Sequence, residues 1–153
     1  MEELTRRLIA RGLRIAAIKH THERGVKLDS PGTDTWRMRQ AGASAVMLVS
    51  PDRHALIASR SLDLDSALSL LEEAVPGLDV VLVEGFKAQT LPREDALKIV
   101  VATGEGDLEF LEKSVGATLV VKSVVDAEGR PNLSEEDVAK VVSEITRLTS
   151  SLA

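Results

Sequence analysis

The strongest constraint on the fold is an uninterrupted apolar run, Val80 to Val83, that ends at Glu84-Gly85. Four apolar residues without polar alternation are typical of a strand buried on both faces, as in a parallel sheet covered by helices. A carboxylate where such a strand stops is placed to hold Mg²⁺ or its water, because this hard cation prefers oxygen ligands. We therefore predict Glu84 as a metal ligand and Gly85 as a point where backbone passes close to a phosphate. The alternative is a structural Glu84 that hydrogen-bonds to a neighbouring loop.

The rest of the chain alternates between helical and strand patterns. Such alternation predicts one α/β domain over residues 1–153, with a mostly parallel sheet and helices on both of its faces. The expected helices are 2–11, 33–40, 63–74, 107–113 and a last helix opened by Ser134. The apolar stripe of this last helix is Val138, Val141, Val142, Ile145 and Leu148. The expected strands are 13–18, 45–49, 54–58, 79–83, 97–102 and 118–121, and residues 124–132 are expected to form a loop.

Composition excludes several classes of function. The chain has no cysteine, so disulfides, thiolate catalysis and Cys-ligated zinc are ruled out. A net charge of −5 argues against a general nucleic-acid binder. No apolar run approaches the roughly 20 residues of a membrane span, and the acidic start is unlike a signal peptide, so we expect a cytoplasmic protein without membrane contact. The residues offer no catalytic nucleophile.

A second group of candidates follows the strand expected over residues 13–18. Lys19, His20 and His22 lie where open α/β folds place ligand groups, beyond the carboxyl end of a strand. The alternate spacing of the two histidines suits zinc or nickel, but a third ligand is needed, for which Asp29 and Asp34 are the nearest candidates. The other interpretations are contact with a phosphate or pterin, and hydrogen bonding within the loop.

The segment 30–35 opens the helix expected at 33–40. Backbone N–H groups at a helix start attract anions, and Arg37 and Arg39 add positive charge. This pattern favours a phosphate or pterin site. Ordinary helix capping by Thr33 or Asp34 is the competing explanation.

Three segments together resemble the family of molybdopterin-guanine dinucleotide biosynthesis adapter protein B (MobB). They are I-K-H-T-H over residues 18–22, D-S-P-G-T-D-T-W-R-M-R-Q-A-G-A over residues 29–43 and L-V-E-G-F-K over residues 82–87. They occur in the family's order, and the resemblance covers roughly residues 1–101.

The resemblance implies a P-loop NTPase fold that binds GTP with Mg²⁺ and forms a homodimer. It also implies a supporting role for a partner, the molybdenum cofactor guanylyltransferase, which attaches GMP to molybdopterin. Nucleotidyl transfer belongs to that partner, and the chain itself is at most a weak GTPase. The predicted nucleotide- or pterin-binding residues are Lys19, His20, His22, Asp29, Gly32, Asp34, Arg39, Gly85 and Lys87, with Glu84 as the metal ligand.

The chain departs from the family at its N-terminus. Family members have a strand and a G-x-x-x-x-G-K-[ST]-T loop before the first helix, whereas here Met1 falls about one turn into that helix and the motif does not occur. A start codon assigned too late, a trimmed chain and a true P-loop-less variant would each explain this, and we favour the first. We expect these 153 residues to bind GTP poorly or not at all. The alternative functions are a GTP-independent anion- or pterin-binding module and a nickel-type metal-insertion GTPase.

Overall fold

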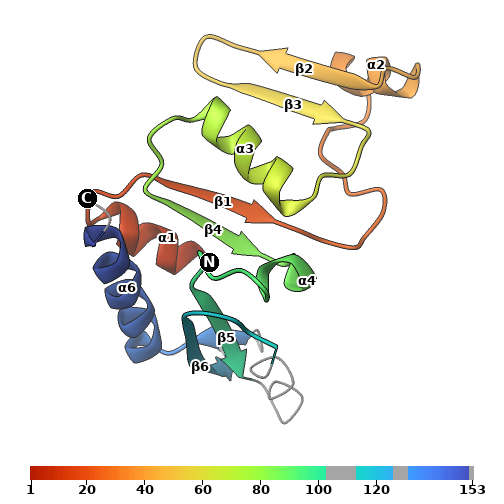
Figure 1. Ribbon diagram of the computed structural model, residues 1–153. Coiled ribbons are helices and arrows are strands. Elements are labelled where there is room, and N and C mark those ends of the chain that lie inside the picture. Colours follow the sequence, from red (N-terminus) through yellow and green to blue (C-terminus); the bar gives the residue numbers. More distant parts are fainter. Residues whose placement is uncertain (103–112, 126–130, 152–153) are drawn as a thin grey trace. The chain divides into compact units, whose positions relative to one another are not determined.

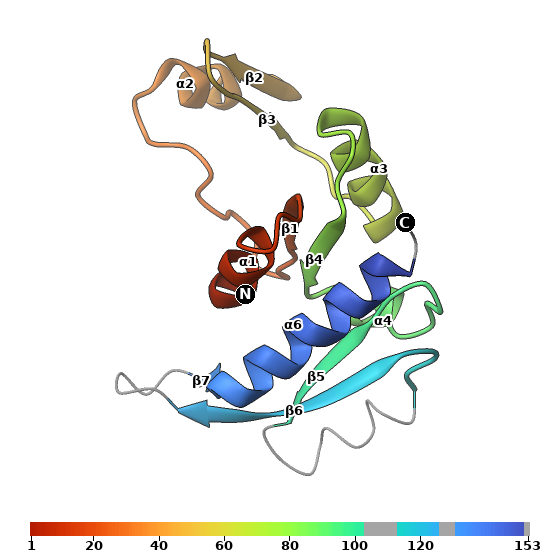
Figure 2. The same cartoon turned by 90° about the vertical axis from the view of Figure 1, so that its left-hand side faces the viewer.

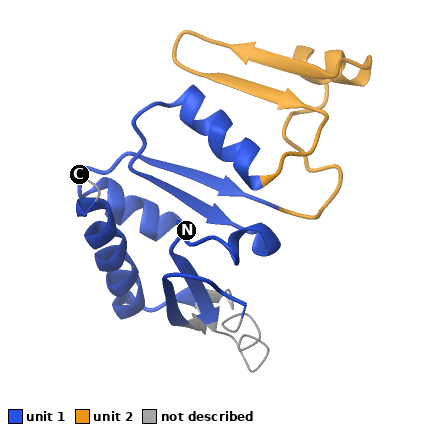
Figure 3. Ribbon diagram, viewed as in Figure 1, with its two compact units in different colours: residues 1–20, 64–153 blue, residues 21–63 orange. Residues whose placement is uncertain are grey.

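The structure is a computed structural model that describes residues 1–102, 113–125 and 131–151 (Figure 1). Its contacts divide the chain into two compact units, shown in Figure 3: unit 1 comprises Met1–His20 and Leu64–Ala153, and unit 2 comprises Thr21–Asp63. The single domain expected over residues 1–153 stays a prediction. In chain order the elements are α1 (Glu2–Ile9), β1 (Ile15–Lys19), α2 (Asp34–Gln40), β2 (Ala45–Val49), β3 (His54–Ala58), α3 (Leu64–Ala74), β4 (Val80–Glu84), α4 (Lys87–Thr90), β5 (Lys98–Ala102), β6 (Thr118–Val125), β7 (Pro131–Leu133) and α6 (Glu135–Ser150).

Parallel strands form the framework of unit 1. Strands β1 and β4 pair in parallel from Ile15↔Val80 to Lys19↔Glu84. Strands β5 and β6 also pair in parallel and start at Lys98↔Thr118, with α6 lying along them in Figure 2. The helix-and-strand alternation thus produced the α/β class that the sequence predicts.

Two antiparallel pairings complete the described strands. In unit 2, β2 and β3 form a hairpin, and both lie where strands are predicted, at 45–49 and 54–58. In unit 1, β7 pairs with the end of β6, with Ser123 opposite Leu133. The loop expected at 124–132 is therefore wrong at both ends, because the β-branched run of β6 continues through Val125. The helix expected at 107–113 falls almost wholly outside the described residues.

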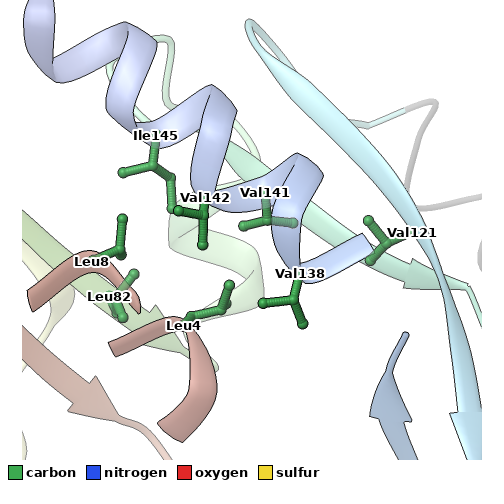
Figure 4. Close-up of a cluster of buried hydrophobic side chains, with 8 residues drawn as sticks. All are labelled: Leu4, Leu8, Leu82, Val121, Val138, Val141, Val142 and Ile145. Carbon is green, nitrogen blue, oxygen red and sulfur yellow. The ribbon is translucent and has the colours of Figure 1, made fainter. Parts of the chain in front are cut away.

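The core of unit 1 joins the first helix to the last. Leu8, Val141 and Val142 are fully buried, and each such side chain contributes about 1.5–3 kcal/mol of hydrophobic stabilisation. The stripe predicted for the last helix is confirmed at its first four positions, while Leu148 is half-buried. Figure 4 shows the cluster of Leu4 and Leu8 from α1, Leu82 from β4, Val121 from β6, and Val138, Val141, Val142 and Ile145 from α6.

The helix ends follow local sequence signals. Ser134 caps α6, where its hydroxyl accepts a hydrogen bond of 3.0 Å from the amide of Asp137. No helix among the described residues is long and apolar enough to cross a membrane.

Candidate functional site at the ends of strands β1 and β4

The last residues of β1 and β4 lie side by side at one edge of the parallel pair. Lys19 and Glu84 are register partners, and the amide of His20 donates a hydrogen bond of 2.8 Å to the carbonyl oxygen of Glu84. Because parallel strands end at the same edge, the sequence-predicted Lys19, His20, Glu84, Gly85 and Lys87 are gathered on this edge of unit 1, which we call the β1–β4 rim.

The two charged side chains of this rim contact each other directly. The ammonium of Lys19 donates to a carboxylate oxygen of Glu84. Both remain open to solvent, with side-chain exposures of 66% for Lys19 and 49% for Glu84. An ion pair exposed to this degree adds only about 0–1 kcal/mol to stability. The pair can therefore be broken by a ligand at little cost to the fold.

Gly85 allows the turn after β4 to approach β1. Its φ is +98°, in the left-handed region, and a Cβ added there would lie 2.8 Å from His20 Cβ and 2.9 Å from the carbonyl oxygen of His20. A side chain at this position is excluded by both the conformation and the neighbouring backbone. The observed close neighbour is thus His20, and an approach of Gly85 to phosphate stays a prediction.

Phe86 is a residue of this site that sequence analysis missed. It is buried and adopts a left-handed conformation with φ 53° and ψ 32°, which costs a residue with a side chain about 1–2 kcal/mol. Its ring packs on the ring of His20 with centroids 4.2 Å apart, and its amide lies 3.5 Å from His20 Nδ1 and donates to it. The only sequence feature that could have singled out Phe86 is the scarcity of aromatic residues in the chain. Its left-handed backbone conformation cannot be recognised from a single sequence.

Hydrogen bonds hold the short helix α4, which carries Lys87. The hydroxyl of Thr90 donates a bond of 3.0 Å to the carbonyl oxygen of Phe86, and Gln89 accepts a bond of 2.7 Å from the amide of Leu64 at the start of α3. Lys87 is the first residue of α4 and is exposed. The segment that carries this lysine is thereby tied to both β4 and α3.

The remaining predicted residues, His22, Asp29, Gly32, Asp34 and Arg39, belong to unit 2. A common site formed by both groups stays a prediction.

Asp29 organises the loop that leads into α2. One carboxylate oxygen accepts bonds of 2.9 Å from the amide of Ser30 and from the hydroxyl of Thr33. Burial alone would raise the pKa of Asp29, but the hydroxyls of Thr35 and Thr33, the amide of Ser30 and the charge of Arg39 together lower this pKa below its ordinary value. Asp29 is therefore a stable anion near neutral pH.

Helix α2 shows the ordinary capping that was the competing explanation for this segment. The hydroxyl of Thr33 accepts a bond of 3.3 Å from the amide of Trp36, and Asp34 pairs with Arg37 at 2.5 Å. Gly32 has a φ of +92° with nothing within 4 Å of an added Cβ, so its freedom serves the turn.

The fit to Mg²⁺ depends on how many ligands the site provides. Within the described residues there is no group of three or more His, Cys, Asp or Glu side chains that would hold a metal ion, so the third ligand required by a His20–His22 centre is not found there. Glu84 fits Mg²⁺ as a single carboxylate, since this ion commonly takes one or two carboxylates and completes its shell with phosphate oxygens and water.

Comparisons with known proteins give the family context. The sequence model of a family described as molybdopterin guanine dinucleotide synthesis protein B (MobB) matches residues 1–122. The molybdopterin-guanine dinucleotide biosynthesis adapter protein of Haemophilus influenzae is 37% identical over 95 residues, which are 61% of the chain and 52% of that protein. The adapter protein of the same description from Escherichia coli is 37% identical over 105 residues, which are 66% of the chain and 55% of that protein. The chain spans about half the length of these curated relatives.

Solved structures show the same fold. A crystal structure of MobB from Bacillus subtilis superposes with a TM-score of 0.65 at 24% identity and covers 93% of the chain and 86% of that protein. A MobB homologue from Bacillus stearothermophilus gives a TM-score of 0.61 at 22% identity and covers 99% of the chain and 88% of that protein. The predicted P-loop NTPase-like α/β fold is confirmed by this likeness.

Proposed function

The chain belongs to the MobB family, and from that membership we propose that it acts as an adapter in molybdenum cofactor biosynthesis. In this role it assists a partner guanylyltransferase that forms molybdopterin guanine dinucleotide. The observation that carries the proposal is the family match over residues 1–122, which includes the whole β1–β4 rim. The chain supplies binding and positioning, and nucleotidyl transfer belongs to the partner.

The β1–β4 rim supports a role in holding an anionic ligand. Lys19 and Lys87 provide positive charge at the ends of parallel strands, where ligands of open α/β folds bind. Glu84 would hold Mg²⁺ when phosphate oxygens complete the shell of the ion. His20 is held by the turn at Gly85-Phe86, and we assign it a contact to the phosphate or pterin.

The segment 29–39 of unit 2, which comprises the loop before α2 and most of that helix, is the second proposed binding element. It contains Gly32, Asp34 and Arg39, with Arg39 as the proposed cation, and His22 precedes it in sequence. Asp29 acts within the loop, since one of its oxygens accepts from Ser30 and Thr33. Molybdopterin is the ligand that we propose for the two elements, and GTP is at most a weak ligand of them in this chain.

We further propose that the chain forms a homodimer. The β2–β3 hairpin of unit 2 exposes large apolar side chains, which are Met47 at 56%, Leu48 at 55%, Val49 at 71% and Leu56 at 52%. Met47, Val49 and Leu56 share one face of the hairpin, since Leu56 is the register partner of Met47 and side chains alternate along a strand. Exposed apolar residues on one face mark interaction surfaces in many proteins. Light scattering tests the proposal: a particle of twice the chain mass is expected, and a monomer at all concentrations would refute it.

The adapter role is tested with the purified chain and its guanylyltransferase. We expect the chain to bind the transferase in calorimetry and to increase the rate at which molybdopterin guanine dinucleotide forms. Glu84→Gln should reduce this increase and leave the melting temperature unchanged, while Glu72→Gln, an exposed substitution on α3, serves as the matched control. Absence of both binding and rate increase for the wild type would overturn the proposal.

Calorimetry with GTP and Mg²⁺ addresses the nucleotide separately. Because the G-x-x-x-x-G-K-[ST] motif does not occur in the 153 residues, we expect weak or undetectable binding of GTP to this chain by itself. A low-micromolar dissociation constant would instead show that the β1–β4 rim and the segment 29–39 suffice for nucleotide binding.

A further inference from the structure

The ion pair between Lys19 and Glu84 places a cation of the protein on the carboxylate that is predicted to bind metal. The two residues are the last register partners of β1 and β4, so the pairing of the strands sets their backbones side by side. The ammonium of Lys19 donates to Oε1 of Glu84. On the function proposed above, this contact affects how Glu84 binds cations.

An ammonium on Oε1 of Glu84 opposes the binding of a divalent cation to the same carboxylate, because the two cations repel each other and the ammonium occupies part of the group. A metal that approaches Glu84 must displace Lys19 or be repelled by its charge at short range. The exposure of the two side chains, 66% and 49%, leaves both free to reorient once the contact is broken. The carboxylate of Glu84 is thus in equilibrium between a state paired with Lys19 and an unpaired state. Breaking the pair costs little free energy because both side chains are exposed.

We propose that Lys19 is an internal competitor for divalent cations at Glu84. With the pair closed, the carboxylate binds a metal more weakly than the same carboxylate without the lysine. An anion that draws the ammonium of Lys19 away opens Glu84, so the β1–β4 rim favours a cation and an anion that arrive together, as in a metal-bound polyphosphate. Lys19 is a positioning and selectivity residue in this scheme, and Glu84 is the ligand.

The expected size of the competition follows from the strength of exposed ion pairs. Pairs of this kind close with an equilibrium constant of about one to five, so removal of Lys19 should strengthen cation binding about two- to sixfold. A larger change would need a buried pair, which the exposure of both side chains excludes.

Paramagnetic line broadening by Mn²⁺ tests the proposal with the metal alone. The full chain is labelled with ¹⁵N, and the amide signals of Gly85 and Phe86, next to Glu84, are followed during a Mn²⁺ titration without nucleotide. The half-broadening concentration is the Mn²⁺ concentration at which these signals lose half of their intensity. In Lys19→Met it should fall two- to sixfold. Lys19→Arg, which keeps a cationic donor at the same place, should remain near the wild-type value, and Glu84→Gln added to Lys19→Met should remove the broadening.

Two controls distinguish an effect of the Lys19–Glu84 contact from an effect of net charge and from misfolding. Lys140→Met makes the same change of net charge at an exposed position of α6 and should leave the titration at Gly85 unchanged. An unchanged amide spectrum away from residues 19 and 84 shows that the variants fold. Equal half-broadening in wild type and Lys19→Met, an equal shift in Lys140→Met, or no broadening at Gly85 in any variant would each overturn the proposal. None of these readouts involves the transferase, so the adapter role can fail while the competition is observed, and the reverse.

Discussion

The amide of His20 donates a 2.8 Å hydrogen bond to the carbonyl oxygen of Glu84, which joins the first residue beyond β1 to the last residue of β4. This bond continues the parallel ladder by one residue and holds His20 against the turn at Gly85 and Phe86. A shift of either strand end would therefore move the whole β1–β4 rim, including the Lys19–Glu84 pair.

Gly85→Ala should destabilise unit 1 by about 2–4 kcal/mol, because the new methyl group adds a contact with His20 backbone to the cost of a left-handed alanine. Gly12→Ala is the matched control, since its φ is +83° and nothing lies within 4 Å of its Cβ. Only the left-handed conformation is penalised there, at about 1 kcal/mol. Urea unfolding of both variants isolates the contact, and equal destabilisation would show that the approach of the β4 turn to His20 is unimportant.

Lys98→Met should lower the free energy of unfolding by about 1–3 kcal/mol. The side chain of Lys98 is 5% exposed, and its ammonium donates to the carbonyl oxygens of Arg93 and Val115. Methionine preserves much of the volume but leaves these carbonyls without their charged donor. Lys140→Met, on the exposed side of α6, should change the free energy by less than about 0.5 kcal/mol. An unchanged free energy of unfolding in Lys98→Met would mean that water replaces the ammonium as the donor to these carbonyls.

Ser134→Ala should cost about 1 kcal/mol, because the hydroxyl of Ser134 accepts the amide of Asp137 at the start of α6. Ser143→Ala, at an exposed position within the same helix, should be neutral or slightly stabilising because alanine is the better helix former. Thermal unfolding monitored by circular dichroism compares the two. The prediction is wrong if both variants have the same melting temperature.

Acid should weaken unit 2 through Asp29. Its pKa is lower in the folded state than in the unfolded chain, so the unfolded state binds the proton more readily. The resulting stabilisation is present above the ordinary pKa of an aspartate and is lost as the pH falls through the lowered value. The fluorescence of Trp36, the single tryptophan of the chain and a member of unit 2, reports this unfolding. Asp29→Asn should reduce the pH dependence of the urea midpoint in this range, and an unchanged dependence would contradict the assignment.

Elements with a strong local signal were predictable from the sequence. The apolar run of β4, the helical stripe of α6 and the cap at Ser134 each determine their structure within a few residues. The meeting of Lys19, His20 and Glu84 also followed, because parallel strands place their carboxyl ends at one edge.

Other features depend on contacts between distant residues and were missed for that reason. The pairing of Lys19 with Glu84 requires the strand register, which a single sequence does not reveal. The left-handed Phe86 is held by its packing on His20, against its intrinsic preference. Strand β7 forms because β6 offers it a partner, although Pro131 favours a turn.

The shared core of α1 and α6 also has a consequence for biosynthesis of the protein. Leu4 and Leu8 are synthesised long before Val138, Val141 and Val142, which lie with them in one buried cluster. A nascent chain must therefore carry the unsatisfied apolar face of α1 until α6 has emerged. Closing so long a loop is slow relative to local helix formation, so unit 1 is expected to complete its folding only after α6 is made and to benefit from chaperones that shield α1 meanwhile.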